Sequence, residues 1–186
     1  LEQALEANPD AKIVAFMHAE TSTGAHSDAE TLVELAHRHH CLTIVDTVTS
    51  LGGSPVKVDE WGIDAIYSGT QKCLSCTPGI APVSFNERAL DKVRNRQSKV
   101  QSWFLDLNLV MGYWGEGAKR AYHHTAPINL LYGLYQALML VMEEEGRKLS
   151  VALADISLAG ARLVARQAKV PVIPGVDGKE YSDAEL

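Results

Sequence analysis

Two short stretches decide the fold of this chain: residues 42–53 read LTIVDTVTSLGG, and residues 62–72 read GIDAIYSGTQK. In each stretch a short apolar run stops at polar residues, as a buried strand does where it leaves a sheet. The first run, Leu42–Val45, stops at Asp46, and the second run, Asp64–Tyr67, stops at a polar segment. Both runs are therefore predicted to be short, buried strands of one sheet.

Strand and helix signals alternate outward from these stretches. Apolar runs at Ile13–Phe16 and Ile80–Phe85 predict two more strands. Ser27 and Glu30 form a capping-box pattern ahead of apolar residues at helical spacing, and Asn86 is placed to cap a further helix. The sequence thus predicts an α/β fold, a mostly parallel sheet flanked by helices.

The second half of the chain is more helical. An aromatic and apolar stretch, 103–114, carries large side chains that we expect to pack on the sheet or on a dimer mate. A long helix is predicted to follow Pro127 and to end near Gly146, and a further helix is predicted over about Leu149–Gln167.

Composition excludes several classes of protein. The 186 residues are 46% hydrophobic and 22% charged, with a net charge of −6. An acidic chain has no general attraction to nucleic acid or to anionic lipid, and no apolar run is long enough to predict a transmembrane helix. Three cysteines suggest a reducing compartment, which we take to be the cytoplasm. Because the chain begins at Leu1 without a signal segment, we expect it to be the interior of a longer protein.

The candidate chemistry lies where the predicted strands end. Residues 18–24, 46–50 and 68–72 are polar, and loops at the carboxyl edge of a parallel sheet meet in space. Taken by itself, Asp46 has a structural interpretation, in which it caps its own turn through Thr47 or Ser50. Taken by itself, Lys72 is typical of a solvated loop. A lysine amine brought near a carboxylate in a cleft is what an aldehyde cofactor requires.

Four ordered motifs resemble the alanine–glyoxylate and serine–pyruvate aminotransferases, which are class V aminotransferases of pyridoxal-phosphate fold type I. They are HAETSTG at 18–24, VDTVTSLGG at 45–53, YSGTQK at 67–72 and YHHTAP at 122–127. The resemblance runs from about Ile13 to about Gly146. It implies that residues 1–146 are part of the cofactor-binding large domain, and that residues 147–186 lead towards a smaller C-terminal domain.

The resemblance also implies a role for each matching residue. Lys72 would bind the aldehyde of pyridoxal 5'-phosphate covalently and move the substrate proton, and Asp46 would pair with the ring nitrogen. Val48 would pack on one face of the ring, Thr21 would lie near the ring, and Gln71 would contact the phosphate. Without the resemblance, Val48 is equally well interpreted as a buried aliphatic residue with no special role, and Thr21 as a turn residue.

Tyr122 and Thr125 would reach the phosphate of the neighbouring subunit's cofactor, so the resemblance implies a homodimer with a shared active site. Its substrates would be small amino acids and 2-oxo acids, with an amino group passing from alanine or serine to glyoxylate or pyruvate. A structural interpretation of Tyr122, core packing with a locally bonded hydroxyl, stays open.

Two alternative functions remain at this point. One is another fold-type-I enzyme, a cysteine desulfurase or a kynureninase-like lyase; desulfurases commonly have a histidine just before the lysine, where this chain has Gln71. The other is a catalytically silent fragment or dimerisation module. The family's phosphate loop and its substrate-binding arginine are not recognisable in this chain, so we expect the 186 residues alone to bind the cofactor weakly.

Two further clusters predict no metal site. His37, His39 and His40 crowd the end of the first long helix, where we expect them to be solvated because a helix C-terminus favours positive charge. Cys73 and Cys76 have a Cys-x-x-Cys spacing, but no second pair accompanies them.

Overall fold

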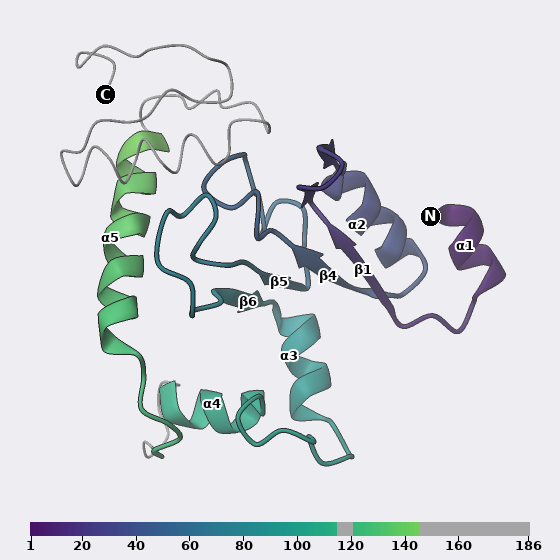
Figure 1. The fold of residues 1–186 in the computed structure, drawn as a ribbon. Helices are drawn as coiled ribbons and strands as arrows, with labels where there is room; N and C mark the ends of the chain where they lie inside the picture. The colour runs from purple at the N-terminus through teal and green to yellow at the C-terminus, as the bar shows by residue number, and fades with distance from the viewer. Residues whose placement is uncertain (115–120, 146–186) are drawn as a thin grey trace, which may run out of the picture.

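The computed structural model describes residues 1–114 and 121–145. Its main sheet has the strand order β1-β4-β5-β6, and the first three strands are parallel (Figure 1). β6 runs antiparallel to β5 at one edge. The strands are β1 (Ile13–Met17), β4 (Leu42–Asp46), β5 (Ala65–Tyr67) and β6 (Val83–Phe85). The predicted mostly parallel sheet is confirmed, although the fourth strand is shorter than its apolar run.

A small two-stranded sheet and five helices complete the described residues. The small sheet pairs β2 (Ala19–Glu20) with β3 (Ala25–His26) in the loop that follows β1. The helices are α1 (Glu2–Ala7), α2 (Ala29–Arg38), α3 (Glu87–Arg94), α4 (Leu107–Trp114) and α5 (Ile128–Glu145). None of these helices is both long and apolar enough to cross a membrane.

The expected capping box at the start of α2 is wrong. The N-cap of α2 is Asp28, whose side chain accepts hydrogen bonds from the backbone N–H and the hydroxyl of Thr31. Ser27 instead donates its hydroxyl to the carbonyl of Met17 at 2.8 Å. A tertiary contact to the end of β1 therefore removes Ser27 from the cap, and the neighbouring carboxylate takes its place.

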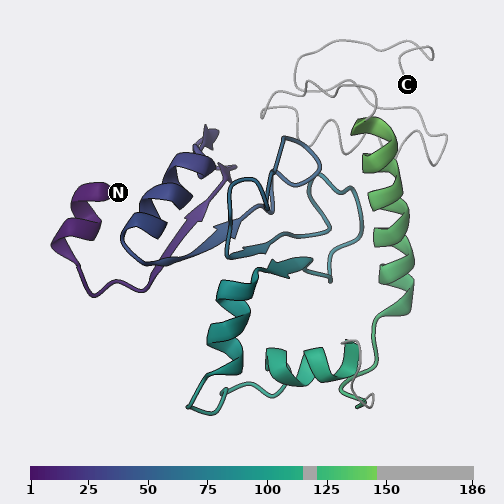
Figure 2. The same ribbon diagram turned by 180° about the vertical axis from the view of Figure 1, so that it is seen from behind.

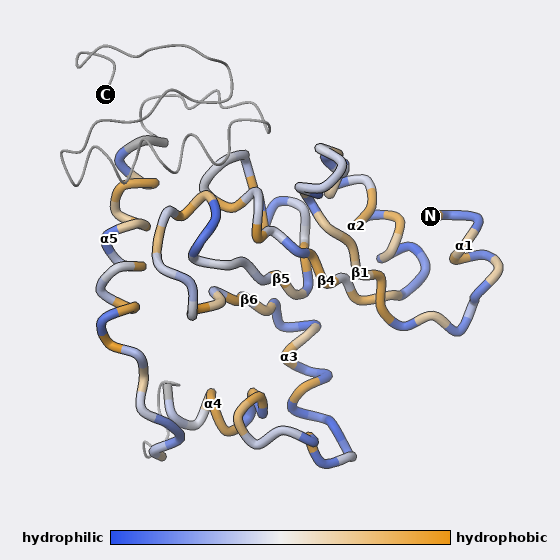
Figure 3. Tube along the Cα trace, in the orientation of Figure 1, coloured by the Kyte–Doolittle hydropathy of each residue, from blue (hydrophilic) through white to orange (hydrophobic). Residues whose placement is uncertain are grey.

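The core lies between α2 and one face of the sheet. Val33 of α2 packs with Val45 and Ile66 of the strands and with Ile63. Alternate residues point to the other face of the sheet, as the pleat of a strand requires. Along that face Ile13, Met17, Tyr67 and Val83 are exposed among the described residues. Figure 3 shows the hydrophobic character of the central strands.

The carboxylate of Asp64 is fully buried at the end of the sheet where β5 begins. It accepts hydrogen bonds from the backbone N–H and hydroxyl of Thr43, and from the side chains of His37, Asn86 and Arg88. Burial by itself would raise the pKa of Asp64, but these donors and the Arg88 charge outweigh burial and hold the pKa below its ordinary value. The expectation that His37 is solvated is wrong, because its ring nitrogen Nε2 is hydrogen bonded to this carboxylate at 2.8 Å.

The helix α5 lies along the loops that follow β4 and β5 (Figures 1 and 2). Side chains of α5 approach glycines in these loops: a Cβ on Gly79 would meet Leu130 Cδ1 at 2.9 Å, and one on Gly52 would meet Val141 Cγ2 at 3.4 Å. The predicted long helix is confirmed. The second predicted helix and the predicted domain boundary at residues 146–147 lie outside the described residues.

Two aromatic side chains of the stretch that leads into α4, Trp103 and Phe104, are not packed on the sheet. Trp103 and Phe104 are more than half exposed, and the Trp103 ring stacks on His123 with 4.0 Å between ring centroids. The nitrogen Nε2 of His123 lies 3.1 Å from the Trp103 carbonyl. The expectation that Trp103 and Phe104 pack on the sheet is therefore wrong. The alternative, that they pack on a dimer mate, stays a prediction.

Candidate active site

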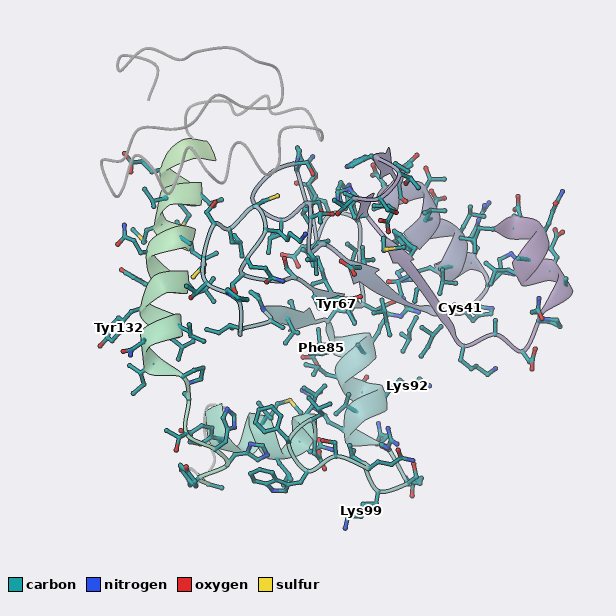
Figure 4. The ribbon with its side chains drawn as sticks, viewed as in Figure 1. Cys41, Tyr67, Phe85, Lys92, Lys99 and Tyr132 are labelled. Atoms are coloured by element: carbon teal, nitrogen blue, oxygen red, sulfur yellow. The ribbon has the colours of Figure 1, made fainter. Side chains whose placement is uncertain are left out.

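The candidate site begins at the adjacent ends of two parallel strands. Asp46, the last residue of β4, is paired in register with Tyr67, the last residue of β5. Its Oδ1 accepts the Val48 N–H at 2.8 Å, so Asp46 does cap its own turn, through a different donor from the Thr47 or Ser50 expected. Its Oδ2 accepts the Tyr67 hydroxyl at 2.7 Å, and this bond raises the pKa of the Tyr67 phenol (Figure 4).

The loop that carries Lys72 is tied to the turn after Asp46. The thiol of Cys73 donates to the carbonyl of Thr49 at 3.3 Å, and Cys73 is buried, which raises its thiol pKa to about 11. Ser68 donates its hydroxyl to the carbonyl of Thr47 at 3.1 Å. Lys72 itself is exposed. The loop that carries the Lys72 amine and the turn that follows Asp46 thus leave the same end of the sheet. Hydrogen bonds join this loop to this turn.

A glycine brings Val48 and Gln71 together between these loops. A Cβ on Gly69 would lie 2.9 Å from Gln71 Oε1 and 3.3 Å from Val48 Cγ1. Because residue 69 has no side chain, an aliphatic group and an amide, two of the predicted cofactor contacts, can lie this close to the loop backbone.

The loop that carries Thr21 is held against the Asp46 turn by His18, which precedes β2, and by Ala19, the first residue of β2. The His18 N–H donates to the Asp46 carbonyl at 2.8 Å, and the Thr49 hydroxyl donates to the Ala19 carbonyl at 2.6 Å. The ring nitrogen Nδ1 of His18 lies 2.9 Å from Ser50 Oγ. Thr21 is exposed in the turn between β2 and β3.

The His18 ring is buried beneath this loop, with the rings of His26 and Trp61 beside it. Burial, and then the charge of His26, lower the pKa of His18 to about 4. The ring is therefore neutral at physiological pH.

Tyr122 and Thr125 lie away from this group. Their hydroxyl oxygens are 2.7 Å apart, and Tyr122 is 72% exposed. The segment 121–127, which carries both residues, precedes α5 and lies beside α4, whereas the loops that follow β4 and β5 lie farther along α5 (Figures 1 and 2). The structure thus gathers the loops of Thr21, Asp46 and Lys72 but does not bring Tyr122 and Thr125 to them within one chain.

Sequence reasoning missed Tyr67 and His18. Tyr67 ends an apolar run and opens the YSGTQK motif, but neither gave it a role, because its contact with Asp46 depends on the register of two strands. His18 was quoted as part of a motif without a role. The signal for His18 was its position: it directly follows the strand β1, which pairs with β4, the strand that ends at Asp46.

A mostly parallel sheet, with an acid at the end of β4 and a lysine in the loop after β5, is typical of one class of protein, the pyridoxal-phosphate enzymes of fold type I. Comparison with known families agrees: residues 1–156 match the family Aminotransferase class-V. The chain belongs to this family.

The relatives are transaminases that act on glyoxylate. The chain is 44% identical over 128 residues to alanine–glyoxylate aminotransferase of Rattus norvegicus, covering 68% of this chain and 31% of the rat protein. It is 36% identical to (S)-ureidoglycine–glyoxylate transaminase of Bacillus subtilis, covering 94% of this chain and 50% of that protein. The chain thus spans about a third to a half of the length of these relatives.

Solved structures give the same result. Alanine–glyoxylate aminotransferase from Nostoc sp. is 49% identical, with a TM-score of 0.72 over 77% of this chain and 37% of that one. Ureidoglycine–glyoxylate aminotransferase from Bacillus subtilis is 41% identical, also with a TM-score of 0.72, over 77% of this chain and 36% of that one. The fold predicted from the sequence is confirmed by both.

Proposed function

We propose that this chain carries the lysine and the acid of a pyridoxal-phosphate aminotransferase that moves an amino group from alanine or serine to glyoxylate or pyruvate. The observation that carries the proposal is the arrangement of two strand ends. Asp46 ends β4, Lys72 follows β5, and the Cys73–Thr49 hydrogen bond ties their loops together. The glyoxylate transaminases among the relatives support the substrate class.

The residues present fit the cofactor. Val48 and Gln71, two of the proposed cofactor contacts, approach each other at Gly69, where a Cβ would lie 3.3 Å from Val48 Cγ1 and 2.9 Å from Gln71 Oε1. The donor set is also suitable, because an amine, a carboxylate and neutral amide and hydroxyl groups match an aldehyde, a pyridine nitrogen and a phosphate. When bound, pyridoxal phosphate supplies an aldehyde that condenses with an amine and a ring that accepts the electron pair left by a departing proton.

Each residue then has a defined task. Lys72 would hold the cofactor through its Nζ and, as a free amine, would move the proton of the substrate carbon. Asp46 would hold a proton on the ring nitrogen through a carboxylate oxygen. Val48 would exclude water from one ring face, while Thr21 and Gln71 would donate hydrogen bonds from the surrounding loops.

We also propose that the active protein is a homodimer in a reducing, cytoplasmic compartment. Tyr122 and Thr125 form an exposed, hydrogen-bonded pair of hydroxyls in a segment separate from the Lys72 loop, as groups that serve a neighbouring subunit must be. The three cysteines are free thiols, which suits a reducing compartment.

Borohydride trapping tests the proposal. The chain is incubated with pyridoxal phosphate, reduced with borohydride and mapped by peptide mass spectrometry. We expect the pyridoxyl group on Lys72, and its loss from the peptide in Lys72→Ala, whereas Lys99→Ala, which removes an exposed lysine elsewhere, leaves labelling unchanged. Equal labelling of many surface lysines, with no preference for Lys72, contradicts the proposal.

A further inference from the structure

The carboxylate of Asp46 is held at both of its oxygens. Oδ1 accepts the backbone N–H of Val48 at 2.8 Å, and Oδ2 accepts the Tyr67 hydroxyl at 2.7 Å. One donor belongs to the turn of the same strand and the other comes across from β5. Two donors on different oxygens fix the plane of a carboxylate, because rotation about its Cβ–Cγ bond would break both bonds.

The carboxylate still has capacity for a third donor. A carboxylate oxygen has two acceptor sites, so each oxygen of Asp46 can accept one more hydrogen bond. A protonated pyridine nitrogen is a donor of this kind. The direction from which the ring nitrogen can approach is therefore set by the two hydrogen bonds that are already present.

We propose that Tyr67 is a positioning residue that acts through Asp46 on the ring nitrogen of pyridoxal phosphate. The inference rests on the proposed function and adds to it a residue that is not among the cofactor contacts. Tyr67 touches the carboxylate, and its effect on the cofactor passes through that group.

Tyr67 suits a clean test because it is 39% exposed. Replacing it with phenylalanine removes one hydroxyl, leaves no cavity and leaves no buried donor without a partner. Tyr67→Phe therefore keeps the fold, which thermal unfolding checks. The matched control is Tyr132→Phe, which removes the hydroxyl of an exposed tyrosine on α5 (Figure 4).

The test compares two ligands that differ at the ring nitrogen alone. Dissociation constants are measured for pyridoxal phosphate and for its 1-deaza analogue, in which a carbon replaces that nitrogen. We expect Tyr67→Phe to weaken the binding of pyridoxal phosphate about tenfold, close to the lower end of what one hydrogen bond to a charged group contributes, and to leave the binding of the analogue unchanged. Tyr132→Phe changes neither constant.

The outcomes separate this inference from the proposed function. If borohydride traps Lys72 but Tyr67→Phe weakens both ligands equally, or neither, the inference is overturned and the proposed function stands. If Lys72 is not trapped, both are overturned. A second readout needs no cofactor: ultraviolet titration of the Tyr67 phenol gives a pKa above the usual value, and Asp46→Asn lowers it. A Tyr67 phenol that titrates alike in wild type and Asp46→Asn contradicts the hydrogen bond itself.

Discussion

The imidazole Nε2 of His37, on α2, lies 2.8 Å from Oδ2 of Asp64, the residue that precedes β5. Asp64 is fully buried, whereas the His37 side chain keeps 29% of its surface exposed. The pair joins the helix that covers the sheet to the strand that leads to the Lys72 loop. At the other end of β5, Tyr67 is paired in register with Asp46.

Asp64→Asn is expected to lower the free energy of unfolding by about 2–4 kcal/mol. The asparagine NH₂ group replaces one acceptor oxygen with a donor, so donors that now bond to the carboxylate lose their acceptor. Urea denaturation at pH 7 measures the loss, and Asp59→Asn, at an exposed position, is the control. Since the pKa of Asp64 is held below 3.8, its stabilisation is fully present above that pH and is lost as the pH falls below it. A variant as stable as wild type would contradict the role of this network.

His18 predicts a second pH dependence. Its pKa is about 4 in the folded chain against an ordinary 6.5, so the unfolded chain binds the proton first as the pH falls. The contribution of the neutral ring is complete above pH 6.5 and is lost between pH 6.5 and 4. We expect wild type to lose about 2 kcal/mol between pH 7 and pH 5 from this group. Urea denaturation of wild type and of His18→Gln at both pH values tests this. The variant should lose less stability than wild type, because it lacks the part of the loss that comes from the His18 ring.

An exposed histidine provides the control for His18. His40→Asn removes a titratable ring at a residue with φ of 60°, a conformation that asparagine tolerates well. We expect the loss of stability between pH 7 and pH 5 to match wild type in this variant. If His18→Gln also matches wild type, the buried ring is not the source of the pH dependence.

Gly52 and Gly24 separate backbone strain from steric contact. Both have positive φ, at 88° and 69°, so a side chain at either position is strained by about 1 kcal/mol. A Cβ on Gly52 would also meet Leu74 Cδ2 at 3.2 Å, whereas one on Gly24 meets nothing within 4 Å. We therefore expect Gly52→Ala to unfold at a lower urea concentration than Gly24→Ala. Equal midpoints would show that Leu74 and α5 move aside freely.

The sequence predicts the sheet well because buried parallel strands are short apolar runs that stop at polar residues. It does less well wherever two elements meet. Ser27 and Asp28 are equally good caps, and the carbonyl of Met17 decides between them. Nothing in the local pattern shows that His37 pairs with a carboxylate 27 residues later, so a solvated ring was the reasonable expectation.

The candidate site divides in the same way. Asp46 and Lys72 are visible in the sequence because each follows a buried strand, and the family motifs add Thr21, Val48 and Gln71. Tyr67 is not visible, because its hydroxyl reaches Asp46 through the pairing of β4 with β5, which is a property of the folded sheet.

Tyr122→Phe tests whether the exposed hydroxyl pair serves a neighbouring subunit. Within one chain the Tyr122 hydroxyl bonds to Thr125 at an exposed position, so its removal should change the free energy of unfolding by less than about 0.5 kcal/mol. If the hydroxyl binds a neighbour's phosphate, the affinity for pyridoxal phosphate falls several-fold. Because that contact exists only in a dimer, the difference from wild type disappears at protein concentrations where sedimentation shows a monomer. Tyr135→Phe, at another exposed tyrosine, should leave the affinity unchanged, and a Tyr122→Phe defect that persists in the monomer would assign Tyr122 to its own chain.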